Sequence, residues 1–289
     1  MPSSSAFIGL VCSSLLLAPT GVSARLSRSL ADANETSAEW TYRAMGTAGE
    51  EPYGPDDWYL GYPDCALTKQ SPINIAADVL QVTTSDEFSL MFNSATCNSS
   101  ELVFQADMAV YQVYYDGCEE QPSVMFQNET FSLLQFHIHS PSENLFGGAE
   151  YAADIHMVHV SEAGGLLVVG IMLETSEYGH NVELQHLWDV LGMGQNVTDM
   201  AFDSSAYSLL PANPTFATFS GSLTTPPCSE GVRWIVMNEP VVMGKSQLDD
   251  YRHYVATYPG SKVDELGNTN RPVQDLNGRD LYFVNPVAA

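Results

Sequence analysis

Short runs in which apolar and polar residues alternate make up most of the chain from residue 88 onward. Turn residues separate these runs, and each run has the length of a β-strand. The pattern predicts a mostly β fold, a single domain on a large twisted, mainly antiparallel sheet, because no repeat or linker divides the series. The predicted strands are residues 88–92, 102–105, 110–115, 131–139, 151–160, 166–173 and 232–242.

The helical period of 3.6 residues is much rarer. It is clear in residues 182–191 and weaker in residues 247–254, for which Ser246 is the expected N-terminal cap. A few short helices should therefore accompany the sheet. The aromatic residues before the first strand are spaced by Gly and Pro, which favours a segment held by ring packing; they are Trp40, Tyr42, Tyr53 and Trp58.

The first 24 residues have the pattern of a secretory signal peptide, an apolar stretch over residues 6–19 followed by small residues up to Ala24. Polar residues interrupt the stretch, which is too short for a membrane anchor. No later segment is long or apolar enough to span a bilayer, so no transmembrane anchor is expected. Residues 25–37 are polar and are expected to form a flexible segment before a domain at 38–289.

Cysteines and glycosylation sequons agree with secretion or delivery to a luminal compartment. Cleavage after Ala24 removes Cys12 and leaves four cysteines, an even number that favours disulfide bonds and allows three pairings. None has the CxxC spacing of thiolate zinc sites. The remaining cysteines are Cys65, Cys97, Cys118 and Cys228, and the sequons are at Asn34, Asn98, Asn128 and Asn196.

A net charge of −25, from 35 acidic and 10 basic residues, excludes two classes of partner. Nucleic acids and anionic membrane surfaces bind basic patches, which so few Lys and Arg residues cannot form. The acidic residues are scattered, as is typical of a solvated surface. Neither the oligomeric state nor the physiological role follows from the sequence.

Two histidines in the predicted strand 131–139 form half of a metal site. Alternate side chains of a strand share a face, so His137 and His139 lie beside Gln135. The next predicted strand places Asp154 and His156 on one face in the same way. If the two strands pair, three neutral imidazoles converge, a set that suits zinc with water as the fourth ligand.

Two side chains are expected to form hydrogen bonds with the second ring nitrogen of these ligands. Zinc-bound imidazoles usually donate their second N–H to a carboxylate or an amide. Gln135 and Asp154 each lie two residues from a histidine and on its face. His159 faces the other way and is interpreted as structural. The histidines expected at the surface are His180, His186 and His253.

The local pattern also fits a second type of metal site. In cupins, an HxH pair, a glutamate and a later histidine bind iron or manganese. Glu143 follows His139 at a comparable spacing, so on the local residues alone it is a candidate fourth ligand.

Seven motifs distributed along the chain decide between these two interpretations. With them the sequence resembles the α-class carbonic anhydrases, in particular secreted eukaryotic or algal-type members, from Trp40 to Arg279. All occur in the family's order and at its spacing, which argues against a cupin. The motifs are WTY at 40–42, GPDDW at 54–58, QSPINI at 70–75, QFHIHSPSE at 135–143, ADIHMVH at 153–159, GSLTTPPC at 221–228 and NRPVQ at 270–274.

The resemblance implies reversible hydration of carbon dioxide to bicarbonate and a proton by a zinc-bound hydroxide. The implied zinc ligands are His137, His139 and His156. Thr224 is similar to the threonine that accepts a hydrogen bond from this hydroxide and donates one to a buried glutamate, here Glu143. Sulfonamides and small anions are the implied inhibitors. The residues implied to contact bicarbonate or carbon dioxide are Thr225, Val158, Val168, Leu223 and Trp234.

The resemblance also implies how the cysteines pair. Cys65 and Cys228 match a disulfide bond of secreted members that braces the threonine loop, which leaves Cys97 and Cys118 for each other. Closing so long a loop contributes about 4–5 kcal/mol in the chain-entropy model, less any strain.

Two positions depart from the family's pattern. The fastest members carry a histidine that exports the proton, and the alignment places Ala109 there. Asp154 replaces the usual glutamate, and its shorter reach is expected to weaken zinc retention or to shift the pKa of the bound water. We therefore expect an active but slower enzyme. The alternative is a catalytically silent, carbonic-anhydrase-like binding or matrix protein, although such proteins typically lack one of the zinc histidines.

Overall fold

The structure is a computed structural model that describes most of the chain between residues 38 and 285. The described residues are 38–43, 49–78, 80–95, 101–105, 110–115, 118, 120–191, 206–212, 215–263 and 266–285. Some of the positions predicted above lie outside them, namely the signal peptide, residues 25–37, Asn34, Asn98, Asn196, Cys97 and Ala109.

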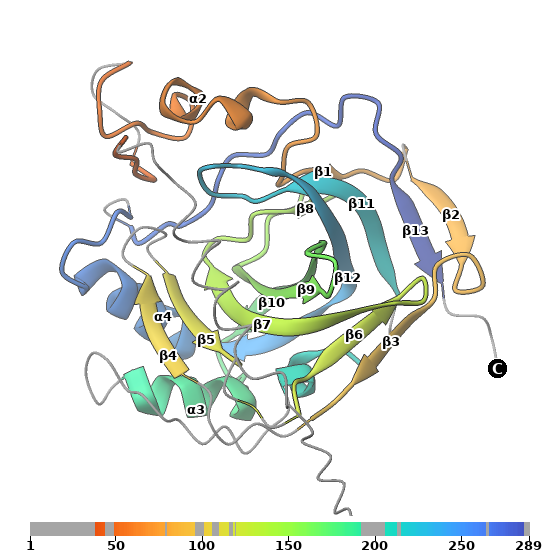
Figure 1. Ribbon diagram of the computed structural model, residues 1–289. Coiled ribbons are helices and arrows are strands. Elements are labelled where there is room, and N and C mark those ends of the chain that lie inside the picture. Colours follow the sequence, from red (N-terminus) through yellow and green to blue (C-terminus); the bar gives the residue numbers. More distant parts are fainter. Residues whose placement is uncertain are drawn as a thin grey trace, which may run out of the picture.

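One curved sheet of eleven strands dominates the described part of the chain (Figure 1). Its order is β2 (Gln81–Thr84), β13 (Tyr282–Asn285), β11 (Phe216–Ser222), β12 (Glu230–Gly244), β10 (Leu166–Ser176), β9 (Ala153–Ser161), β7 (Glu129–His139), β5 (Val110–Tyr114) and β4 (Glu101–Gln105). Two further strands extend it, since β6 (Ser123–Phe126) pairs with both β7 and β3 (Leu90–Asn93). Most neighbours are antiparallel, whereas β10–β12 and β13–β2 are parallel, so the sheet is mixed.

The predicted fold class is confirmed, and each of the seven predicted runs overlaps a strand. The sequence pattern missed strands that are short or rich in Gly, Ser and Thr. These are β2, β6, β11 and β13, together with β1 (Asn74–Ile75) and β8 (Leu145–Phe146), which pair in a small separate sheet.

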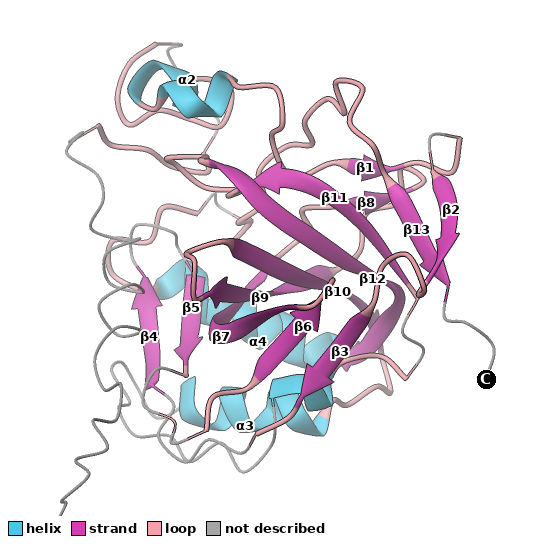
Figure 2. Cartoon of the chain, turned by 45° about the vertical axis from the view of Figure 1, so that its right-hand side comes forward, coloured by secondary structure: helices cyan, strands magenta, loops and turns pink. Residues whose placement is uncertain are grey.

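The two longer helices lie together on one side of the sheet, at the opposite end of the molecule from α2 (Trp58–Gly61) (Figure 2). The first, α3 (Val182–Leu191), has the predicted bounds. The second, α4 (Lys245–Thr257), begins earlier than predicted, and Ser246 is not its cap. The cap is Gly244, two residues before the predicted serine, and its N–H donates to Oε1 of Gln247 at 3.0 Å. The 3-10 helices η1 (Pro63–Ala66) and η2 (Ala206–Leu209) complete the described helical elements.

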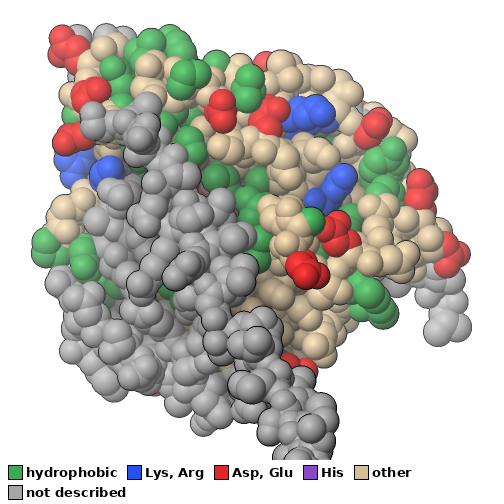
Figure 3. Space-filling model, in the orientation of Figure 1, with side chains coloured by type: hydrophobic (Ala, Val, Ile, Leu, Met, Phe, Trp, Pro, Cys, Tyr) green, Lys and Arg blue, Asp and Glu red, His purple; other side chains and the backbone are tan. Residues whose placement is uncertain are grey.

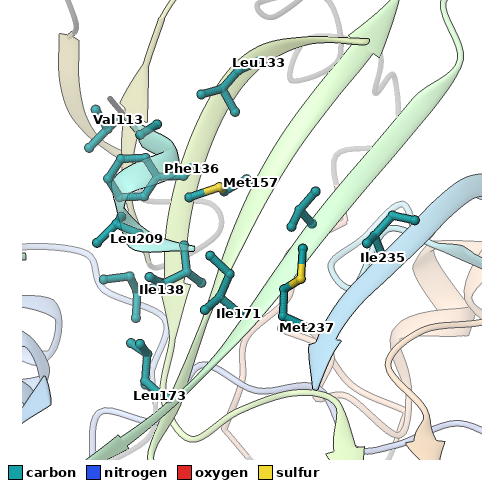
Figure 4. Packing of buried hydrophobic residues seen from close by; sticks show 14 of the residues in the cluster. Val113, Leu133, Phe136, Ile138, Met157, Ile171, Leu173, Leu209, Ile235 and Met237 are labelled. Atoms are coloured by element: carbon teal, nitrogen blue, oxygen red, sulfur yellow. The ribbon is translucent and has the colours of Figure 1, made fainter. Parts of the chain in front are cut away.

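A β-bulge in β7 sets which side chains face the core. Its register with β9 shifts between Leu133 and Gln135. Before the shift Leu133 faces the main core, and after it Phe136 and Ile138 do (Figure 4). The extra residue therefore changes the parity of the strand. The histidines of β7 consequently face away from the main core.

Aromatic rings hold the N-terminal segment, as predicted. Trp40, Tyr42 and Trp58 pack edge to face, with ring centroids 5.2–5.8 Å apart. Lys262 lies over the Trp40 ring at 5.0 Å, which joins this segment to a distant part of the chain.

Charge is spread thinly over the surface. Figure 3 shows acidic side chains scattered over the visible face and only a few groups of Lys and Arg. Within the described residues, no helix has the length and apolar character needed to cross a membrane.

His159 faces the main core, as predicted, and is fully buried. Its Nε2 atom lies 2.9 Å from the Tyr207 hydroxyl, and the two rings stack at an interplanar angle of 13°. Burial lowers the pKa of His159 from 6.5 to about 4, so the imidazole is neutral in the folded protein at neutral pH.

The pKa of His159 predicts that acid destabilises the fold in a defined window. Between pH 6.5 and about 4 the unfolded chain binds a proton at this position and the folded chain does not. The free energy of unfolding should therefore fall as the pH falls, by up to about 3 kcal/mol from this residue. Urea titrations across this range should show a weaker pH dependence for His159→Gln, which keeps a partner for Tyr207. If the free energy of unfolding depended on pH equally in the two proteins, the acid effect could not be assigned to His159.

Candidate metal site

Three histidines converge between β7 and β9. The two strands are antiparallel, and His137 pairs directly opposite His156, with His139 two residues further along β7. One ring nitrogen of each histidine lies within 4.8 Å of one from each of the others. All three side chains are buried. The predicted pairing thus creates a compact group of three nitrogens that one metal ion could contact.

The second nitrogen of each imidazole already has a partner. His137 Nδ1 lies 2.9 Å from Oε1 of Gln135, and His156 Nε2 lies 3.0 Å from Oδ2 of Asp154. The His139 Nδ1 atom lies 2.6 Å from a backbone carbonyl, that of Thr269. Because carbonyl and carboxylate oxygens only accept, each partner fixes the ring N–H on its own side.

These partners leave the other nitrogen of each ring with a free lone pair. Nε2 of His139 is buried and has no hydrogen-bond partner among the described residues. Burial, and then the nearby imidazoles, hold the pKa of His137 well below its ordinary value, and burial does the same for His156. Three neutral nitrogens with free lone pairs fit a zinc ion with one position left for water.

Asp154 reaches its histidine despite being shorter than the usual glutamate. The same Oδ2 atom also accepts the backbone N–H of Glu143 at 3.1 Å. Burial raises the pKa of Asp154 to about 7, and the His139 imidazole opposes that rise. The carboxylate is thus anchored between β9 and the turn that follows β7.

Glu143 lies beside the free ring nitrogens of two of the histidines. Its Oε1 atom accepts the backbone N–H of Arg271 at 2.8 Å, and its Oε2 atom is 3.6 Å from His139 Nε2 and 3.7 Å from His156 Nδ1. Within the described residues, the group that could hold an ion consists of the three histidines without Glu143. Burial, and then Asp154, raise the pKa of Glu143 well above its ordinary value.

Thr224 acts on the carboxylate of Glu143. The Thr224 side chain lowers the pKa of Glu143 by hydrogen bonding, against the larger rise that burial causes. The contact is a loose one, because Oε2 of Glu143 has no hydrogen bond of ordinary geometry among the described residues. Thr224 and Thr225 are both buried, in the loop between β11 and β12. Thr225 O accepts the N–H of Cys228 at 2.8 Å, which closes a turn that begins at Thr225.

A disulfide bond joins Cys228 to Cys65, the pairing that the family resemblance implies. It ties the threonine loop to a segment 163 residues away. Cys118 is also disulfide-bonded. Its predicted partner, Cys97, lies outside the described residues, so that pairing stays a prediction.

Arg271 joins the disulfide to the site, a role that the sequence did not reveal. Its guanidinium donates to Oε1 of Gln70 at 2.8 Å, to Ser71 O at 2.9 Å and to Cys65 O at 3.1 Å. It also lies over the Trp58 ring at 5.6 Å. Its own backbone N–H holds Glu143, so one residue connects three segments of the chain. Thr269 and Arg271 contact the site through backbone atoms, which are the same in every residue type, so the sequence does not reveal these contacts.

An apolar wall lies beside the three histidines. Val158, Val168 and Trp234 belong to a second buried cluster, on the other face of the sheet from the main core, and Leu223 packs against it. The Trp234 ring is 4.9 Å from that of His156. The structure thus brings the residues predicted to contact carbon dioxide to the metal side of the sheet.

The three histidines predicted at the protein surface, His180, His186 and His253, are all exposed to solvent.

Comparison with known proteins identifies the family of this arrangement. The chain matches the eukaryotic-type carbonic anhydrase family over residues 53–285. It is similar to a carbonic anhydrase of Pectobacterium atrosepticum, 32% identical over 254 residues that cover 84% of this chain and 90% of the relative. A carbonic anhydrase of Nostoc sp. is 36% identical over 238 residues, covering 78% of this chain and 81% of the relative. The solved α-carbonic anhydrase of Thermovibrio ammonificans, in complex with the inhibitor sulfanilamide, has a TM-score of 0.69 at 31% identity and covers 85% of this chain and 99% of its own.

Removing the Cys65–Cys228 bond should destabilise the protein. Replacing both cysteines by serine should lower the free energy of unfolding by roughly 2–5 kcal/mol, because the unfolded chain gains entropy when so long a loop opens. Urea denaturation under oxidising conditions measures the loss. With excess thiol, the difference between the two proteins should disappear. A difference that persists there would mean that the serines disturb packing instead.

Proposed function

Because the chain belongs to the eukaryotic-type carbonic anhydrase family, and is thus an enzyme that hydrates carbon dioxide, we propose that it works with a zinc ion held by His137, His139 and His156. The observation that carries this proposal is the buried group of three nitrogens whose lone pairs are left free by their partners. Zinc, when bound, lowers the pKa of its water to about 7 and so supplies a hydroxide near neutral pH, an effect for which carbonic anhydrases are the reference case.

Thr224 and Glu143 are proposed to orient the nucleophile. A carboxylate can only accept hydrogen bonds, so a threonine hydroxyl that donates to Glu143 can in turn only accept one from the nucleophile. That leaves the lone pair of the nucleophile for the carbon of carbon dioxide. The Arg271 N–H supports this role, because it fixes the carboxylate from the opposite side.

Substrate and product are proposed to use different walls of the site. Carbon dioxide is apolar and suits the side chains of Val158, Val168, Leu223 and Trp234, which lie together beside the histidines. Bicarbonate is a polar anion, for which Thr225 and the backbone N–H of Thr224 are the proposed contacts. Sulfonamides and small anions should compete for the same place, as sulfanilamide is bound by the relative from Thermovibrio ammonificans.

Proton release is proposed to proceed without a histidine shuttle. The family position for that histidine corresponds to Ala109, which cannot carry a proton. His180, His186 and His253 are exposed and do not belong to the metal group. Proton export therefore relies on water and buffer, and it should limit turnover.

The proposed place of work is the secretory route, either outside the cell or in a luminal compartment. The support is the predicted signal peptide together with the disulfide bond, because such bonds persist in oxidising compartments. The strongly negative charge of the chain argues against nucleic acids as partners.

Loss of one ligand should abolish both metal binding and activity. We expect one zinc per chain in the purified enzyme and a much lower content in His137→Ala, with loss of carbon dioxide hydration that sulfonamide cannot reduce further. Gln135→Ala should weaken zinc affinity about 10–100-fold, because it removes only the partner of a ligand. His159→Gln, on the other face of β9, is the control and should keep both. Iron instead of zinc, with oxygen consumption, would contradict the proposed zinc site.

Buffer should determine the rate of turnover. Stopped-flow assays should show turnover rising with added imidazole, because the buffer carries the proton that Ala109 cannot. Ala109→His should raise turnover in weak buffer and shrink the effect of imidazole, while hydration at low substrate concentration stays similar. Fast turnover independent of buffer in the unmodified enzyme would contradict this prediction.

A further inference from the structure

A pocket opens where strand ends of the sheet meet, and none of its lining residues belongs to the group of three histidines. Its volume is about 350 Å³, at the lower end of the range for small-molecule sites. The pocket is formed by the starts of β7, β10 and β12 and by residues near the end of β11. Phe126 and Phe131 form an apolar floor of which only a small part is exposed, and Glu129, Ser220 and Arg233 supply polar groups. This mixture suits a small ligand that carries several polar groups.

Arg233 lines this pocket and has no acidic partner in an ion pair among the described residues. Its guanidinium lies 5.9 Å from the centre of the Phe126 ring. No ion pair found in the described ranges includes Arg233. Its N–H groups are therefore available to a ligand that enters beside the aromatic ring.

The hairpin between β6 and β7 places a glycosylation sequon at the edge of this pocket. Phe126 pairs with Glu129, which leaves Gln127 and Asn128 as a two-residue loop. Both have positive φ, 49° and 64°, as in the tight turns that match the twist of a hairpin. Asn128 is exposed at the tip, and Thr130 completes its sequon.

The chain neighbours of Asn128 connect the sequon to the pocket. Gln127 and Glu129 both line it, as does Phe126, two residues before the asparagine. A sugar attached to Nδ2 of Asn128 would therefore begin at the pocket's edge. The tether makes its entry intramolecular, which replaces a bimolecular binding step by a high effective concentration.

We propose that Asn128 carries an N-linked glycan whose first N-acetylglucosamine docks in this pocket, beside Arg233 and Glu129. The hydroxyl and acetamide groups of the sugar meet Arg233, Glu129 and Ser220, and its C–H groups cover the small exposed part of the aromatic floor. The docked sugar binds only the folded chain and so stabilises it. The proposal rests on entry into the secretory pathway and is independent of the metal chemistry.

Gly165 allows the pocket to be filled without altering the sequon. A Cβ placed there would lie 3.7 Å from Cε1 of Phe131 and 3.8 Å from Oε1 of Glu129, so a larger side chain would extend among the lining residues. The same Cβ would be 3.1 Å from Oγ of Ser161, which is tight. Arg233→Ala is therefore the second variant, since it removes polar contacts without adding bulk.

The experiment compares proteins secreted by a eukaryotic host and trimmed with endoglycosidase H to one N-acetylglucosamine per site. Peptide mass spectrometry should find the sugar on Asn128. The melting temperature should be about 2–4 °C higher than that of Thr130→Ala, which lacks this sequon alone. In a Gly165→Leu or Arg233→Ala background, the gain from the sugar should shrink or vanish. The same pairs made without glycosylation in a bacterial periplasm give the effect of Thr130→Ala itself.

Three results would overturn the proposal. These are an unmodified Asn128 in the secreted protein, a sugar that leaves the melting temperature unchanged, and an equal gain in the wild-type and both pocket-variant backgrounds. Carbon dioxide hydration should be the same with and without the sugar, because the pocket shares no residue with the proposed zinc and substrate contacts. Failure of this proposal is thus distinguishable from failure of the proposed zinc chemistry.

Discussion

The antiparallel register between β7 and β9 places His137 directly opposite His156, and the remaining parts of the site are arranged around that pair. A shift of one residue would turn one of the two imidazoles to the other face of the sheet. The register is held by burial, because β9 is buried along its whole length and tolerates polar groups only where they are paired. On the metal side, Gln135 is paired with His137 and Asp154 with His156.

The bulge in β7 makes this register compatible with the core. Phe131 and Leu133 occupy odd positions and pack in the main core, as Phe136 and Ile138 do from even positions. Without the extra residue at 134, either the first pair or the histidines would lie on the wrong face. One irregular residue thus lets a single strand contribute to the hydrophobic core along its length while the histidines lie on its other face.

The sequence predicted those parts of the molecule that are encoded in local pattern. Alternation gave the long strands, and it placed His137, His139 and Gln135 on one face, because side-chain direction in a strand depends only on parity. Short strands such as β13 were missed, since four residues carry too little pattern and are held by pairing with β11 and β2. Thr269 and Arg271 were missed as partners because their backbone groups do the work, and backbone atoms are the same in every residue type. The start of α4 was misplaced for a related reason, as Gln247 caps it from within the helix.

Two hydrogen bonds also fix the order in which the site can form: Thr269 O accepts one from His139, and Glu143 accepts one from the backbone N–H of Arg271. A growing chain contains all three histidines once residue 156 has been added, yet the partners of His139 and Glu143 arrive only with residues 269 and 271. At about 5–20 residues per second, roughly 5–25 seconds of synthesis separate these two points. The last strand, β13, must then insert between β2 and β11, which closes a contact between residues 81–84 and 282–285. The three-histidine site is therefore complete only after residues 269–271 and β13 have been added, and a metal ion would enter it in whichever compartment the chain occupies at that point.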